Sequence, residues 1–133
     1  MPKQIINPPG LQPPRGFNHG FLVTGGKILF MAGQDAGNQD GVILAIGDLV
    51  AQFEQVLQNL QAVVVEAGGN MQDIVKLNIF VKDRDDYVSK LKPLGAVFRQ
   101  YFGNHYPAMA LFEVSAFFHH DALIEIEGFA VID

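Results

Sequence analysis

The segment DALIEIEGFAVID, residues 121–133, predicts a strand buried in a sheet, with two acidic side chains in an unexpected place. Alternate residues of a strand share one face. One face is wholly apolar and holds Ala122, Ile124, Ile126, Gly128 and Ala130. The other face sets Glu125 and Glu127 among the large apolar side chains of Leu123, Phe129 and Val131.

Two carboxylates on one face of a buried strand are costly unless they are paired, solvated in a cavity or partly protonated. Neighbouring carboxylates of this kind are candidates for general acid/base catalysis. The alternative is a solvated strand face that carries two ordinary surface glutamates. The pattern of residues leaves both interpretations open.

Composition indicates one globular domain over residues 1–133, long enough to bury a core. Apolar residues make up 49% and charged residues 17%, with eleven phenylalanines, which suggests that some apolar surface is buried between subunits. The net charge of −5, without a cluster of Lys or Arg, argues against a nucleic-acid partner.

The chain contains no cysteine, which removes disulfides, thiolate nucleophiles and Cys-ligated zinc. The start MPKQIINPP has no apolar signal core and no run reaches membrane-spanning length, so we expect a soluble, cytoplasmic protein without a membrane partner. His119 and His120 are a weak metal signal, because adjacent residues of an extended chain diverge and no third ligand has suitable spacing. We expect neither a metal nor a cofactor.

Patterns along the chain predict five strands and two helices. Residues 7–16 hold four prolines and predict an extended loop. Residues 18–23 and 27–32 are predicted to pair as a hairpin through Gly25-Gly26.

A long amphipathic helix is expected after the N-cap Asp48, ending at Gly68-Gly69. A strand at 73–82 and a charged turn at 83–86 follow it. A second helix is expected over 91–102, with Pro93 in its first turn, and two last strands over 108–115 and 122–132. The order β-β-α-β-α-β-β indicates an α+β fold, a sheet with two helices on one face.

Several segments resemble the RidA/YjgF/UK114 (reactive-intermediate deaminase) superfamily. They are MAGQ at 31–34, NLQAVVVEAGG at 59–69, DIVKLNIFVKD at 73–83, YFGNHYPA at 101–108, EV at 113–114 and IEIEGFAV at 124–131. The resemblance implies a chorismate-mutase-like fold with a mixed sheet, assembled into a homotrimer around a central barrel. It also implies three clefts between subunits, each of which takes a small-molecule substrate.

The same resemblance implies hydrolysis of an enamine or imine to a carbonyl compound and ammonia. Glu125 matches the glutamate that positions the attacking water, and Gly33 matches a glycine that borders the substrate. Phe17 stands where many members have a tyrosine. His19, in GFNH, resembles the GYSH form of arginine-lacking subgroups and is a candidate substrate contact.

Position 109 departs from the family pattern, because Met109 replaces the arginine that binds the substrate carboxylate. A charged hydrogen-bonded pair is worth about 1.5–3 kcal/mol, so its loss weakens carboxylate binding by about 10- to 150-fold. Arg15 and Arg99 are the candidate replacements. We therefore expect an arginine-lacking member that acts on a larger or differently charged substrate than a simple 2-imino acid.

Two other functions stay open. A non-catalytic homotrimer that binds a small metabolite or a protein partner in the same cleft fits the lost arginine and the Phe17 substitution. An endoribonuclease, a label that this family often carries, would have His19 as its histidine near the cleft, and the acidic chain disfavours it.

Overall fold

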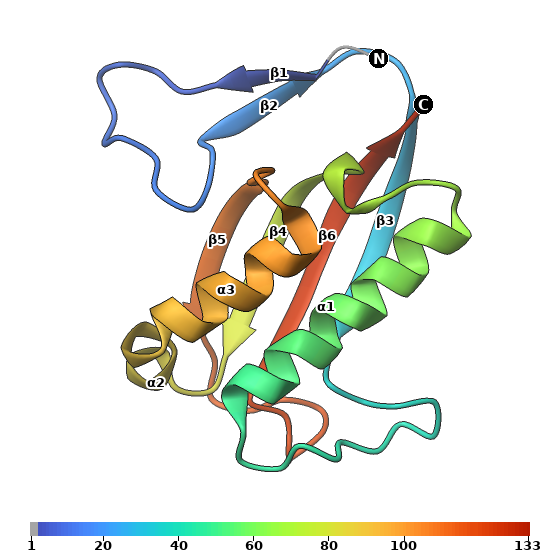
Figure 1. The fold of residues 1–133 in the computed structure, drawn as a ribbon, viewed down its shortest axis with the longest axis vertical. Helices are drawn as coiled ribbons and strands as arrows, with labels where there is room; N and C mark the ends of the chain where they lie inside the picture. The colour runs from blue at the N-terminus through green and yellow to red at the C-terminus, as the bar shows by residue number, and fades with distance from the viewer. Residues whose placement is uncertain (1–2) are drawn as a thin grey trace.

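The computed structural model describes residues 3–133, which form a mixed sheet with helices on one face and a separate pair of strands (Figure 1). The elements are β1 (Lys3–Ile6), β2 (Gly20–Val23), β3 (Lys27–Gln34), α1 (Leu49–Glu66), the 3-10 turn η1 (Met71–Asp73), β4 (Ile74–Val81), α2 (Arg84–Ser89), α3 (Leu91–Phe102), β5 (Ala108–Glu113) and β6 (Ile124–Ile132). The predicted α+β class is confirmed, and the predicted order lacked β1 and α2.

The four-stranded sheet runs in the order β3-β6-β4-β5. β6 is antiparallel to both of its neighbours, whereas β4 is parallel to β5. A parallel pair needs a crossover connection, and α2 with α3 provides it. α1 packs on β3, β6 and α3, and Figure 1 shows α1 and α3 across the same face of the sheet.

Strand β6 has the two faces that its sequence predicts. Ile124, Ile126 and Ala130 are fully buried toward the helices, while Glu125 and Glu127 are half-buried on the opposite face. At Gly128 a Cβ atom would lie 2.1 Å from the Lys76 carbonyl oxygen, so glycine lets β6 approach β4 closely.

The predicted hairpin between residues 18–23 and 27–32 is wrong. Gly25 and Gly26 do form a turn with positive φ angles of 78° and 80°. However, β2 pairs antiparallel with β1 and not with β3, which pairs with β6. Figure 1 shows the β1–β2 pair beyond one end of the sheet. The turn therefore redirects the chain from β2 to β3 without pairing them. The partner of β2 is β1, a four-residue strand whose sequence lacks a clear alternation.

The two long helices begin and end where their sequences predict. The Asp48 side chain accepts a hydrogen bond from the Ala51 amide at 3.1 Å, and α1 ends before Gly68, whose φ is 91°. α3 covers residues 91–102 as predicted. The charged turn expected at residues 83–86 is instead the start of α2, because the Asp83 side chain caps its first turn by accepting from the Asp86 amide.

The sheet face opposite the helices carries large apolar side chains that stay exposed in the single chain. Phe30 is 73% exposed and Ile28 63%, and the Phe30 ring packs edge-on against Phe129. This face also holds Glu125 and Glu127, so acidic groups lie in an apolar surface. Within residues 3–133, no helix is both long enough and apolar enough to cross a bilayer.

Candidate functional site

Glu125 lies on the open face of β6, opposite Phe80 of β4. Burial, followed by the negative charges of Asp35 and Glu127, raises the pKa of the Glu125 carboxyl group above its ordinary value. A carboxylate with a raised pKa is a stronger base, which suits it to taking a proton from water.

Gly33 lies directly against this carboxylate. A Cβ atom at position 33 would be 2.3 Å from Oε2 of Glu125. The pairing of β3 with β6 is irregular between Met31 and Gln34, and this irregularity brings the backbone at Gly33 toward Glu125. The structure therefore brings together two of the residues that the sequence singled out.

Glu127 has a different environment from Glu125, two residues away on the same strand face. Its Oε2 accepts a hydrogen bond from Nδ2 of Asn78 on β4, at 3.2 Å. This bond ties β6 to β4 and gives Glu127 a structural role. Within residues 3–133, the side chain of Glu125 makes no such hydrogen bond.

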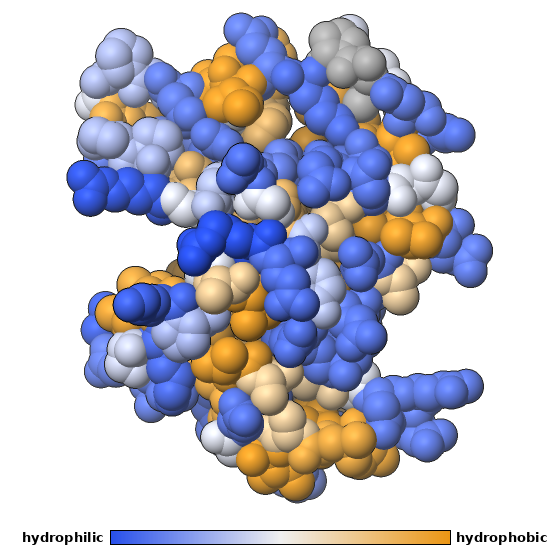
Figure 2. Space-filling model, viewed as in Figure 1, coloured by the Kyte–Doolittle hydropathy of each residue, from blue (hydrophilic) through white to orange (hydrophobic). Residues whose placement is uncertain are grey.

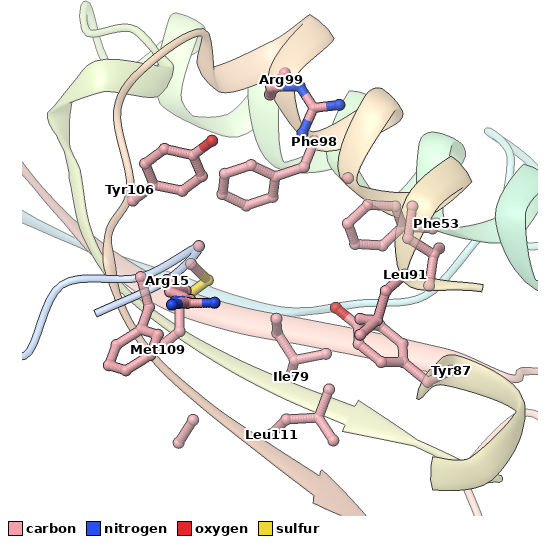
Figure 3. A pocket seen from close by; sticks show the side chains of 15 residues that line it. Arg15, Phe53, Ile79, Tyr87, Leu91, Phe98, Arg99, Tyr106, Met109 and Leu111 are labelled. Atoms are coloured by element: carbon pink, nitrogen blue, oxygen red, sulfur yellow. The ribbon is translucent and has the colours of Figure 1, made fainter. Parts of the chain in front are cut away.

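Phe17 and Met109 line a cavity of about 470 Å³ on the helix side of the sheet. Figure 3 shows Met109, Ile79 and Leu111 on the strand side of this cavity and Phe98 with Arg99 on α3. The segment that carries Phe17 is docked at the start of β5 by Asn18. The Asn18 amide donates to the Pro107 carbonyl at 3.1 Å, and its side chain donates to the Tyr106 carbonyl at 2.7 Å.

His19 is held beside this cavity and does not line it. Its Nε2 is 2.8 Å from the Gln12 carbonyl oxygen, and its ring meets Phe17 edge-on at 5.1 Å. The histidine thus fixes the N-terminal loop and the orientation of the Phe17 ring.

Four of the five site residues fall into two groups on opposite sides of the sheet, and His19 lies beside the second group. Glu125 and Gly33 lie on the open face, whereas Phe17 and Met109 belong to the cavity between α3 and β5. One strand, β4, lies between β6 and β5, and the side chains of Glu125 and Met109 point to opposite faces. One copy of the chain does not bring both groups to one small substrate.

A polar centre that the sequence did not indicate lies at Gln52. The Gln52 side chain is fully buried, donates to the carbonyl oxygens of Ala45 and Asp121, and accepts from the Leu123 amide. It ties the loop before α1 to the loop before β6 and so holds the chain that leads to Glu125. Its place within the apolar stripe of α1 is the sequence signal that could have indicated it.

His119 and His120 gain a third neighbour that sequence spacing did not suggest. Ligand atoms of both histidines and of Asp121 lie within 4.8 Å of one another. However, the Asp121 amide donates to Nδ1 of His119, and His120 is exposed. The expectation of a protein without a metal stays a prediction.

The fold and the site define a class: an α+β domain with an apolar open sheet face, two neighbouring acids on that face and a cavity under the second long helix. A family model described as Endoribonuclease L-PSP matches residues 11–132, and the chain belongs to this family. A RutC family protein of Pyrococcus abyssi is 33% identical over 105 residues, 79% of each chain.

Solved structures place the chain in the same superfamily. A Yersinia pestis protein of unknown function from the conserved Rid protein family is 33% identical, with 99% of this chain and 100% of that chain covered and a TM-score of 0.88. RidA from the Antarctic bacterium Psychrobacter sp. is 28% identical, with 87% and 88% covered and a TM-score of 0.68. The resemblance to the RidA/YjgF/UK114 superfamily is confirmed.

Proposed function

We propose that this protein hydrolyses an enamine or imine to a carbonyl compound and ammonia, with Glu125 as the general base. The observation that carries the proposal is the Glu125 carboxyl group, whose pKa is raised and which lies against the backbone of Gly33. A side chain at position 33 would displace this carboxylate, so glycine there keeps Glu125 in its present position.

The reaction needs one group that moves two protons. The oxygen of water bonds to the imine carbon while Glu125 takes a proton from that water and passes it to the nitrogen. Glu125 then takes the hydroxyl proton of the carbinolamine and gives it to the nitrogen as the carbon–nitrogen bond breaks. Ammonia leaves, the carbonyl forms and Glu125 is again a carboxylate.

The complete site in this proposal is built between copies of the chain. The open sheet face with Glu125 exposes Phe30 and Ile28, which a second copy would cover. A homotrimer in which the cavity of one copy meets the Glu125 face of the next unites the two groups that one chain keeps apart. Light scattering tests the expected mass of three chains, about 44 kDa from a chain of 14.6 kDa.

The direct test is hydrolysis of 2-imino acids, generated in place by an amino-acid oxidase, with wild type and three variants. Glu125→Gln should lose about 100-fold or more of the rate. Glu127→Gln, on the same strand face, is the matched control and keeps activity. Because the negative charge of Glu127 raises the pKa of Glu125, this control should also move the acidic limb of the pH–rate profile to lower pH.

Met109→Arg tests how position 109 sets the choice of substrate. We expect weak wild-type activity on simple 2-imino acids and higher activity in this variant, since arginine can bind a carboxylate in a bidentate manner. Unchanged activity in Glu125→Gln would refute the mechanism. If neither the wild type nor any variant hydrolyses small or large imines, the metabolite-binding homotrimer is favoured. The apolar Met109 side of the cavity supports that alternative.

A further inference from the structure

The cavity beside Met109 is lined mainly by apolar and aromatic side chains. Its volume of about 470 Å³ lies in the range of small-molecule sites. Phe98 and Tyr106 stack with ring centroids 5.6 Å apart and planes 6° apart, which makes a flat aromatic wall. Such a wall suits an aromatic or bulky aliphatic group better than a three-carbon acid.

Two of the three arginines of the chain line this same cavity. Arg15 comes from the N-terminal loop and Arg99 from α3, and Figure 3 shows them on different sides of the cavity. The third arginine, Arg84, pairs instead with Asp85 at 2.7 Å. Figure 2 shows a notch between the β1–β2 pair and the helices, bordered by strongly hydrophilic side chains.

Neither guanidinium has an internal partner among residues 3–133. Arg15 and Arg99 form no ion pair or side-chain hydrogen bond there, and no aspartate or glutamate lines the cavity. In a chain of net charge −5, this cavity is therefore a local positive site. Each guanidinium group, free on the protein side, is available for the carboxylate of a ligand.

Gly95 makes room for Arg99. A Cβ atom at position 95, one turn earlier in α3, would lie 3.2 Å from Nη1 of Arg99. Glycine inside a helix costs about 1 kcal/mol relative to alanine. Its presence lets the guanidinium lie along the helix surface at the cavity.

We propose that Arg99 and Arg15 bind the carboxylate of a ligand whose apolar, aromatic-sized body fills the cavity over Met109. The inference deepens the proposed function, because it assigns the substrate class of one half of that site: a carboxylic acid larger than a simple 2-imino acid. The charge is bound at the rim instead of at position 109, which leaves the inner wall to the apolar body.

Calorimetric titration with 3-phenylpropanoate tests this assignment, with neutral 3-phenylpropanamide and small propanoate as comparison ligands. The wild type should bind 3-phenylpropanoate at least tenfold more tightly than either comparison ligand. Arg99→Gln and Arg15→Gln should each weaken it about tenfold, as expected for a charged hydrogen bond. Arg84→Gln, which removes an arginine outside the cavity, is the matched control and should bind as the wild type does.

Equal binding of the acid and the amide, binding unchanged in both arginine variants, or no binding to the wild type would each overturn the inference. Glu125→Gln separates it from the proposed function, since this variant should keep the binding of 3-phenylpropanoate and lose turnover. Arginine-dependent binding without any deaminase activity leaves the inference standing and the proposed function refuted. If Arg99→Gln and Arg15→Gln leave turnover unchanged, the proposed function stands and this inference is refuted.

Discussion

Gly33→Ala is the substitution that best tests the geometry around Glu125, because it moves the carboxylate while leaving the Glu125 side chain chemically unchanged. The added Cβ would lie 2.3 Å from Oε2 of Glu125, whereas ordinary contact begins at 3.4 Å. The carboxylate must therefore retreat by about 1 Å. A displacement of this size at a catalytic group costs about 100-fold in rate.

The fold should tolerate the same substitution. Gly33 has no positive φ angle, so the backbone accepts alanine, and the displaced atoms are the end of a flexible, half-buried side chain. We expect a melting temperature within about 2 °C of the wild type, since Gly33 is exposed and only the flexible end of the Glu125 side chain has to move.

The assay is kcat/KM for imine hydrolysis, measured with wild type, Gly33→Ala and Gly10→Ala. Gly10 is the matched control, because a Cβ there meets nothing within 4 Å and activity should not change. A Gly33→Ala protein that is folded and retains kcat/KM within threefold of the wild type would refute the reasoning. A loss shared with Gly10→Ala would show that the change is not specific to the Glu125 carboxylate.

Three further predictions concern stability. Gly128→Ala places a Cβ 2.1 Å from the Lys76 carbonyl oxygen, so chemical denaturation should show a loss of about 3 kcal/mol or failure to fold; an unchanged midpoint would contradict the close β4–β6 approach. Gln52→Ala removes three buried hydrogen bonds to loop backbone, so the free energy of unfolding should fall by about 3 kcal/mol, with Gln55→Ala on the same helix as a milder control. The folded-state pKa of Glu125 is raised, so the free energy of unfolding falls as pH rises from the unfolded-state pKa through the folded-state pKa. Glu125→Gln should therefore be more stable than the wild type at pH 7 and equally stable in acid. An equal difference in stability at both pH values would count against this.

The helices could be predicted closely from the sequence, because their signals are local. Asp48, the apolar stripe of α1 and the glycines after it each act through neighbours within one or two turns. The same holds for the two faces of β6, since alternation along a strand needs only the chain itself. The turn predicted at residues 83–86 was wrong, because the run of charges obscured the role of Asp83 as the N-cap of α2.

Strand pairing could not be predicted in the same way. The Gly25-Gly26 turn is compatible with a hairpin, yet β2 pairs with β1, whose four residues lie more than a dozen positions earlier. A turn limits where the chain bends, but the hydrogen-bonding partner of a strand depends on which other backbone reaches it in register.

The sequence by itself determined the α+β class, the family and the acid on the apolar strand, because periodicity and motif are properties of neighbouring residues. Only the tertiary structure decided that Gly33 touches Glu125, that Met109 lies on the opposite side of the sheet, and that Arg15 and Arg99 line one cavity. Arg15 and Arg99 are 84 positions apart in the chain, and only the docking of the N-terminal loop on the start of β5 brings them to the same cavity. Long-range contacts of this kind depend on how whole elements pack, which no local pattern encodes.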